Sequence, residues 1–176
     1  PALLENIAED VAFEATEFGA TLALQTPSEP INVPANEELL RRTVENLLRN
    51  AIRFTARGSA VEVELKRSAQ QLQLSIRDHG PGVPETALES IFEPFYRVEE
   101  HRARKAGGTG IGLAIARRAT IAHGGTLTAA NAEGGGLIVT LTLPCPASWA
   151  CTAERPSPPI LHLAALLATH ARASLT

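Results

Sequence analysis

The sequence is poor in the features that mark secreted, membrane-spanning or nucleic-acid-binding proteins. Its 176 residues include two cysteines, Cys145 and Cys151, too few for a disulfide framework or a paired-cysteine metal site, which points to a reducing cytosol. No apolar run approaches the ~20 residues that span a bilayer, and no signal peptide is visible. A net charge of −3 without a dense basic run gives no reason to expect nucleic acid as a partner. Because methionine is absent and the chain starts at Pro1, we expect a fragment of a longer protein.

Hydrophobic periodicity divides the chain into helices and strands, and its length allows one domain with a core. Asn36 is placed as a helix N-cap and Gly19 as a helix stop. Expected helices lie at 1–19, 36–54, 84–92 and 110–124, and expected strands at 20–26, 59–68, 72–78, 125–132 and 136–144. This order predicts an α+β fold, with a layer of helices over one face of a mixed, mostly antiparallel sheet.

The composition changes after Pro144. Residues 145–159 are rich in proline, serine and alanine, which is typical of a linker or of disorder. Residues 160–173 could form a small helix with no obvious place in the domain. We therefore expect a domain over 1–144 and a Pro/Ala-rich tail over 145–176.

A glycine-rich segment, GGTGIGLAIARR at 107–118, precedes the last expected helix. Its GxGxG spacing fits neither a dinucleotide fold, which needs GxGxxG directly after a strand, nor a P-loop, which needs GxxxxGK[ST]. A charged segment at 98–108, which we expect to be mobile, comes before it. What remains is a flexible loop entering a helix N-terminus, where free N–H groups and the helix dipole favour an anion. A simple glycine turn into a helix is the alternative.

The helix expected at 36–54 carries two stripes. At 100° per residue one face is apolar, and a polar stripe lies roughly 120° away from it, formed by Asn46, Asn50 and Arg53. Asparagine is a poor helix former, so helix propensity does not explain the pair. The stripe is either ordinary exposed surface or the edge of a site, where a carboxamide oxygen suits Mg²⁺ and Arg53 suits a phosphate.

Two loops complete the pattern. In DHGPGVP (78–84), Asp78 can accept a hydrogen bond from an exocyclic amine, and Gly80 and Gly82 let the backbone approach a flat ring. The alternative is an ordinary turn, in which aspartate and glycine are common. In IFEPFYRVEE (91–100), three aromatic residues lie within five positions. They either pack a loop into the core or anchor the base of the mobile segment, with Arg97 placed to reach phosphate.

NLLRNAIRF, DHGPGVP, IFEPFYR and GGTGIGLAIARR, followed by HGG and a final GGGLIVTLTLP strand, resemble the catalytic ATP-binding domain of bacterial two-component sensor histidine kinases. The resemblance covers roughly residues 1–144 and depends on the order and spacing of the motifs. It implies the two-layer α/β sandwich of the GHKL (Bergerat) type, and IFEPFYR separates the kinases from other families with that fold. AFEATEFGATLALQTP and ENLLRNAIRF most resemble envelope-stress sensors of Gram-negative bacteria.

The resemblance implies a role for each matching residue. Asn50 would hold Mg²⁺, Asn46 would border the phosphates, and Asp78 would read the adenine amine. Arg53 stands where the family usually has lysine, and Phe54 where it often has tyrosine. Catalytic positions would be Asn46, Asn50, Arg53 and Arg97, and the nucleotide would further contact Phe54, Asp78, Gly80, Gly82, Gly108, Thr109, Gly110, Ile111, Gly112 and Leu113.

The implied activity is transfer of the γ-phosphoryl of Mg·ATP to a histidine on a separate dimerisation hairpin, and then to a response regulator. None of the five histidines of this chain has the acceptor context. The full-length parent would be a membrane-anchored homodimer, with this fragment on the cytoplasmic side of the bacterial inner membrane and in no direct contact with the membrane. Related ATPases carry glutamate at the position of Asn46, and an amide cannot act as that base. The alternatives are a non-catalytic nucleotide-binding module and a slow ATPase of the same fold.

Overall fold

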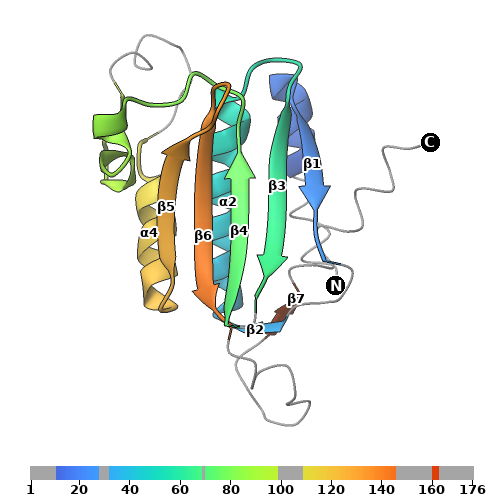
Figure 1. Ribbon diagram of the computed structural model, residues 1–176, viewed down its shortest axis with the longest axis vertical. Helices are drawn as coiled ribbons and strands as arrows, with labels where there is room; N and C mark the ends of the chain where they lie inside the picture. The colour runs from blue at the N-terminus through green and yellow to red at the C-terminus, as the bar shows by residue number, and fades with distance from the viewer. Residues whose placement is uncertain (1–10, 28–31, 69, 99–108, 146–159, 163–176) are drawn as a thin grey trace, which may run out of the picture.

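A computed structural model of the chain describes residues 11–27, 32–68, 70–98, 109–145 and 160–162. The expectations for residues 1–10, for Gly108 and for most of the tail lie outside these ranges. The main sheet has five strands in the order β1-β3-β4-β6-β5 (Figure 1). Their bounds are β1 Thr21–Gln25, β3 Ala60–Arg67, β4 Gln71–Arg77, β5 Thr126–Asn131 and β6 Leu137–Pro144. β1 runs parallel to β3 and the other neighbours pair antiparallel, so the expected mixed sheet is confirmed.

The helices cover one face of this sheet (Figure 1). They are a helical segment at 11–18, α2 (Glu37–Phe54) and α4 (Gly112–Ala122). The Asn36 side chain accepts a hydrogen bond from the Leu39 N–H, which confirms it as the N-cap of α2. Gly19 ends the first helical segment with a φ of +70°, a left-handed value that glycine adopts without strain. Within the described residues, no helix combines the length and the apolar character that crossing a membrane requires.

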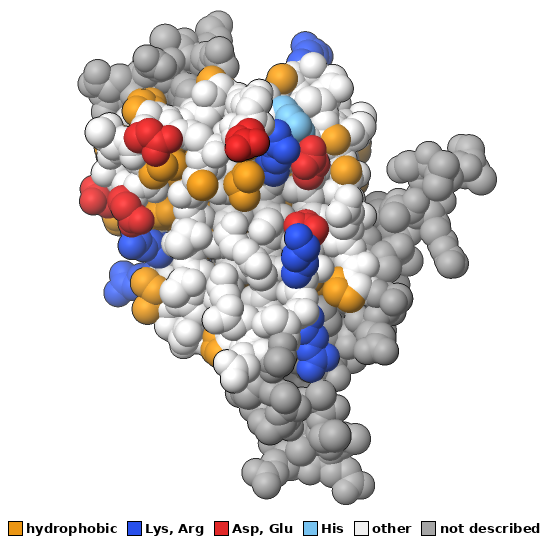
Figure 2. Space-filling view, in the orientation of Figure 1, with side chains coloured by type: hydrophobic (Ala, Val, Ile, Leu, Met, Phe, Trp, Pro, Cys, Tyr) orange, Lys and Arg blue, Asp and Glu red, His pale blue; other side chains and the backbone are white. Residues whose placement is uncertain are grey.

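The core lies between the two layers, because buried and exposed residues alternate along β3, β4 and β6 of the main sheet. Val61, Val63 and Leu65 of β3 point inward, and each buried aliphatic side chain contributes about 1.5–3 kcal/mol relative to exposure. The opposite face of the sheet is open to solvent and carries mainly threonine, glutamine and charged side chains (Figure 2). The α2 residues buried against the sheet and α4 are Leu40, Thr43, Val44, Leu47, Leu48, Ala51 and Ile52.

The helix expected at 84–92 is wrong as a single helix. The structure has two short 3-10 turns there, η1 (Glu85–Ala87) and η2 (Ser90–Phe92). Nine residues are too few to stabilise an isolated α-helix, and Glu93 is extended because it precedes Pro94.

The small helix expected at 160–173 is also wrong where the structure describes it. Ile160–His162 form a short strand, β7, which pairs antiparallel with β2 (Asn32–Pro34). Three residues are too few to show an alternating pattern, so this long-range pairing was not predictable from the sequence.

At the boundary expected after Pro144, Cys145 is fully buried and its N–H donates to the Gln70 carbonyl, so packing continues one residue past Pro144. The division at 144 stays a prediction.

Candidate functional site

A cavity of about 530 Å³ opens between α2, α4, the loop after β4 and the segments on either side of residues 99–108. Every candidate from the sequence that the structure describes lines it, except Gly80. The residues concerned are Asn46, Asn50, Arg53, Phe54, Asp78, Gly82, Arg97, Thr109, Gly110, Ile111, Gly112 and Leu113. Residues as far apart in the sequence as Asn46 and Leu113 thus contribute to one concave site, the arrangement that a small-molecule ligand needs.

One end of the cavity is polar and belongs to α2. Asn46, Asn50 and Arg53 recur at three- and four-residue spacing, so the helix places their side chains on one face. None of the three makes a hydrogen bond or ion pair with any part of the chain that the structure describes. A carboxamide oxygen and a guanidinium that face a cavity without internal partners can bind an oxyanion or a hydrated cation.

The N-terminus of α4 lies at the same end. A Cβ placed on Gly112 would be 3.3 Å from Asn46 Oδ1, so only a glycine lets α4 start so close to α2 without displacing the amide. Ile111, at the N-cap position, makes no side-chain capping bond. Among the described residues no N-cap side chain occupies the first N–H groups of α4, and such a helix start suits an anion at the edge of the cavity.

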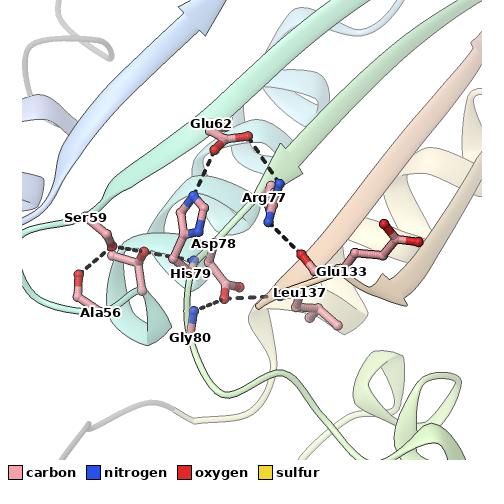
Figure 3. Close-up of polar contacts among 10 residues, drawn as sticks. Ala56, Ser59, Glu62, Arg77, Asp78, His79, Gly80, Glu133 and Leu137 are labelled. Carbon is pink, nitrogen blue, oxygen red and sulfur yellow. Dashed lines mark hydrogen bonds and ion pairs between the residues drawn. The ribbon is translucent and has the colours of Figure 1, made fainter. Parts of the chain in front are cut away.

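The other end of the cavity contains Asp78, which is only 3% exposed. Its Oδ1 accepts hydrogen bonds from the Gly80 N–H at 2.8 Å and from the Leu137 N–H at 3.2 Å (Figure 3). The backbone N–H of Asp78 in turn donates to the Leu137 carbonyl. Gly80 does not line the cavity, but a Cβ there would collide with the Phe54 carbonyl, so its role is to let the loop pass behind the site.

The neighbours of Asp78 are fixed on the open face of the sheet (Figure 3). Arg77 donates to the Glu133 carbonyl at 3.1 Å, and the His79 ring lies 2.8 Å from Glu62 Oε1. The His79 N–H donates to the Thr55 hydroxyl at the end of α2. Together these bonds fix the backbone on both sides of Asp78 and hold its carboxylate in one position.

The third wall joins the IFEPFYR and glycine motifs. The Phe95 N–H donates to the Gly110 carbonyl at 2.9 Å, and both residues have left-handed φ values, +66° for Phe95 and +71° for Gly110. A Cβ on Gly110 would be 3.1 Å from both Phe95 Cα and the Tyr96 carbonyl oxygen. A positive φ is unfavourable for phenylalanine, so this backbone contact holds Phe95 in a strained conformation with its ring 71% exposed.

The sequence missed part of the lining. Arg49 is adjacent to the polar stripe on α2, at about 60° from Asn46, and it also pairs with Glu14 at 2.9 Å and Glu45 at 3.4 Å. The position of Arg49 on the helix, next to the polar stripe, could have indicated that it lines the site. The other lining residues that the sequence missed are mostly apolar, and nothing in the sequence distinguishes them from core residues. They are Pro81, Val83, Ile91, Tyr96, Val98, Ile115 and Leu137.

The site has few ligands for a metal of its own. Within the described ranges no group of three or more histidine, cysteine, aspartate or glutamate side chains could hold an ion. Mg²⁺ nevertheless fits the residues present, because it keeps several waters and takes its other ligands from phosphate oxygens. The Asn50 amide faces the cavity and has no hydrogen-bond partner among the described residues, so it is a suitable protein ligand.

Residues 35–147 match the family described as histidine kinase-, DNA gyrase B-, and HSP90-like ATPase. The sensor histidine kinase RppB of Synechocystis sp. is 38% identical over 142 residues, covering 81% of this chain and 31% of RppB. The sensor histidine kinase CpxA of Escherichia coli is 36% identical over 142 residues, with the same coverage of 81% and 31%. The chain thus spans about a third of the length of these relatives.

Solved structures agree in fold. The mycobacterial sensor histidine kinase MprB superposes with a TM-score of 0.71 at 28% identity, over 81% of this chain and 93% of that one. Full-length ShkA in complex with AMPPNP gives a TM-score of 0.65 at 31% identity, over 81% of this chain and 29% of that one. The two-layer α+β sandwich predicted from the sequence is confirmed.

Proposed function

Because the chain belongs to the histidine kinase-, DNA gyrase B- and HSP90-like ATPase family, we propose that it is the ATP-binding catalytic domain of a sensor histidine kinase. The observation that carries the proposal is the shared cavity. Asn50, Asp78 and Gly110 come from three distant motifs and line one site. The similarity to ShkA, whose structure contains AMPPNP, supports an adenine nucleotide as the ligand.

The two ends of the cavity suit the two ends of ATP. The adenine binds beside Phe54 and Leu137, with its amine at Asp78, and the phosphates extend toward α2 and the N-terminus of α4. Arg53 contacts phosphate through a planar fork, in place of the lysine that the family usually has. Asn50 would hold Mg²⁺, and the ion would supply positive charge beside the phosphate oxygens.

The reaction is transfer of the γ-phosphoryl to a histidine on another domain. A bond forms between an imidazole nitrogen and the γ-phosphorus, and the bond from that phosphorus to the bridging oxygen breaks. ADP leaves with the electron pair, and a base on the acceptor domain or solvent takes the imidazole proton. Asn46 borders the phosphates and cannot deprotonate water, so bound ATP is hydrolysed slowly and waits for the acceptor.

The activity of the whole protein extends beyond this chain. We propose that its partners are the dimerisation hairpin of the same kinase, a second copy of the parent protein, and a response regulator. The parent lies on the cytoplasmic side of the bacterial inner membrane, as a sensor of the type that CpxA represents. The finer similarity to envelope-stress sensors stays a prediction.

The test combines this chain with the dimerisation hairpin of the parent protein, produced separately, and with γ-labelled Mg·ATP. We expect an acid-labile phosphohistidine on the hairpin and almost no phosphate release without it. ATP binding without transfer would instead indicate a nucleotide-binding scaffold. Phosphate release by the isolated chain well above background would indicate an ATPase.

A further inference from the structure

Asn131, the last residue of β5, binds the backbone of the loop that follows β4. Its Oδ1 accepts a hydrogen bond from the Val83 N–H at 3.0 Å, and its Nδ2 donates to the Val83 carbonyl at 2.8 Å. Nδ2 also donates to Glu85 Oε1 at 3.1 Å. Both amide hydrogens and the amide oxygen are thus used, in the pattern by which one strand pairs with another.

This clamp acts on residues that line the cavity. Pro81, Gly82 and Val83 belong to its wall, whereas Asn131 itself does not line it. The loop is already tied at its start, where Asp78 accepts from the Gly80 N–H. Asn131 ties its end, so the short stretch between the two anchors has little freedom to move away from a ligand.

The packing against Gly82 is close. A Cβ on Gly82 would lie 2.7 Å from Asn131 Oδ1, and the φ of Gly82 is +69°. The amide and the glycine therefore fit each other directly, with no space for a side chain between them. The distance from β5 to the cavity wall is set by this contact and by the two bonds to Val83.

We propose that Asn131 is a positioning residue that fixes the width of the base-binding end of the cavity and thereby the preference for adenine. The proposal rests on the proposed function, because it takes the ligand to be a nucleotide. Asn131 acts through the backbone of Val83 and touches no ligand. Its removal lets the wall move outward while leaving the polar side chains of α2 in place.

The test compares Asn131→Ala and Asn131→Asp with a control on the same strand, Thr128→Ala, whose side chain makes no hydrogen bond to any residue that the structure describes. Calorimetry measures the affinity for ATP, GTP and tripolyphosphate, a probe without a base. Asn131→Ala should weaken ATP binding by about fivefold, the equivalent of one net hydrogen bond, and narrow the preference for ATP over GTP. Tripolyphosphate affinity should not change, and Thr128→Ala should behave as wild type.

Asn131→Asp provides a second, graded variant. Its carboxylate still accepts from the Val83 N–H, but it loses both donated bonds and stands beside Glu85, so ATP should bind as weakly as in Asn131→Ala or more weakly. Hydrogen exchange should show the Val83 N–H less protected in Asn131→Ala. Wild-type selectivity in both variants, or an equal loss of tripolyphosphate binding, would overturn the positioning role. A wild-type chain that binds no ATP would overturn the proposed function as well.

Discussion

Asp78 can be replaced in two ways that separate its structural role from its role toward the ligand. In Asp78→Asn the remaining carbonyl oxygen can still accept from the Gly80 and Leu137 N–H groups, while an amide nitrogen replaces the second carboxylate oxygen. In Asp78→Ala both N–H groups lose their acceptor in a site that is almost fully buried. The two variants should therefore differ in stability and agree in their loss of adenine recognition.

The expected magnitudes follow from these two bonds. A hydrogen bond to a charged acceptor contributes about 1.5–3 kcal/mol, and removal of the buried charge offsets part of the loss. We expect Asp78→Ala to lower the free energy of unfolding by about 2–4 kcal/mol, or roughly 10 °C in Tm. Asp78→Asn should stay within about 1 kcal/mol of wild type, because neutral bonds are weaker but burial of the amide costs less.

Binding assays then separate the bases. Adenine presents an amine that donates, whereas guanine presents a carbonyl oxygen that accepts at the equivalent position. The amide nitrogen of Asp78→Asn donates, so its preference should shift from ATP toward GTP in competition calorimetry. Thermal and urea unfolding provide the stability values. Equal stabilities for the two variants would refute the role of the two backbone bonds, and an unchanged ATP preference would refute the assignment to adenine.

Three further predictions concern the polar end of the cavity and the wall formed by Phe95 and Gly110. Asn50→Ala should abolish the tightening of ATP binding by Mg²⁺. If calorimetry still gives the variant a higher affinity for ATP with Mg²⁺ than without it, Asn50 is not a ligand of the ion. Gly110→Ala should weaken ATP binding about tenfold, because the new Cβ meets Phe95. The control is Gly58→Ala, which introduces the same left-handed strain at a position with open space around it. It should lower Tm without changing the affinity for ATP. Arg49→Gln should weaken ATP binding about two- to fivefold at low salt and less at high salt; a salt-independent effect would exclude a charge contact.

Local periodicity predicted the parts of the site that lie on one element. The stripe of Asn46, Asn50 and Arg53 follows from 3.6 residues per turn, and the N-cap at Asn36 follows from hydrogen-bond chemistry at a helix start. The strands were predictable for the same reason, since their alternation of buried and exposed residues is the period of the sheet.

Contacts between distant elements were not predictable in this way. Asn131 is a single polar residue at a strand end, and its partner Val83 is 48 residues away. Arg49 is charged like any exposed helix residue, and its pairing with Glu14 depends on how two helices pack. Leu137 alternates like its neighbours, so its place in the cavity wall depends on where the strand ends relative to Asp78.

The two ends of the cavity are built on different principles, and this difference separates selectivity from catalysis. At the end proposed to bind the base, Asp78 accepts from two backbone N–H groups, and Asn131 bonds to the Val83 backbone and to Glu85, so the wall is held in place before any ligand arrives. At the end proposed to bind the phosphates, Asn46 and Asn50 make no hydrogen bond to any residue that the structure describes. A rigid wall discriminates between bases because it cannot adapt to the wrong one. We therefore expect substitutions at the base end to change which nucleotide binds, and substitutions on α2 to change how tightly the phosphates and Mg²⁺ bind and how fast the phosphoryl group is transferred.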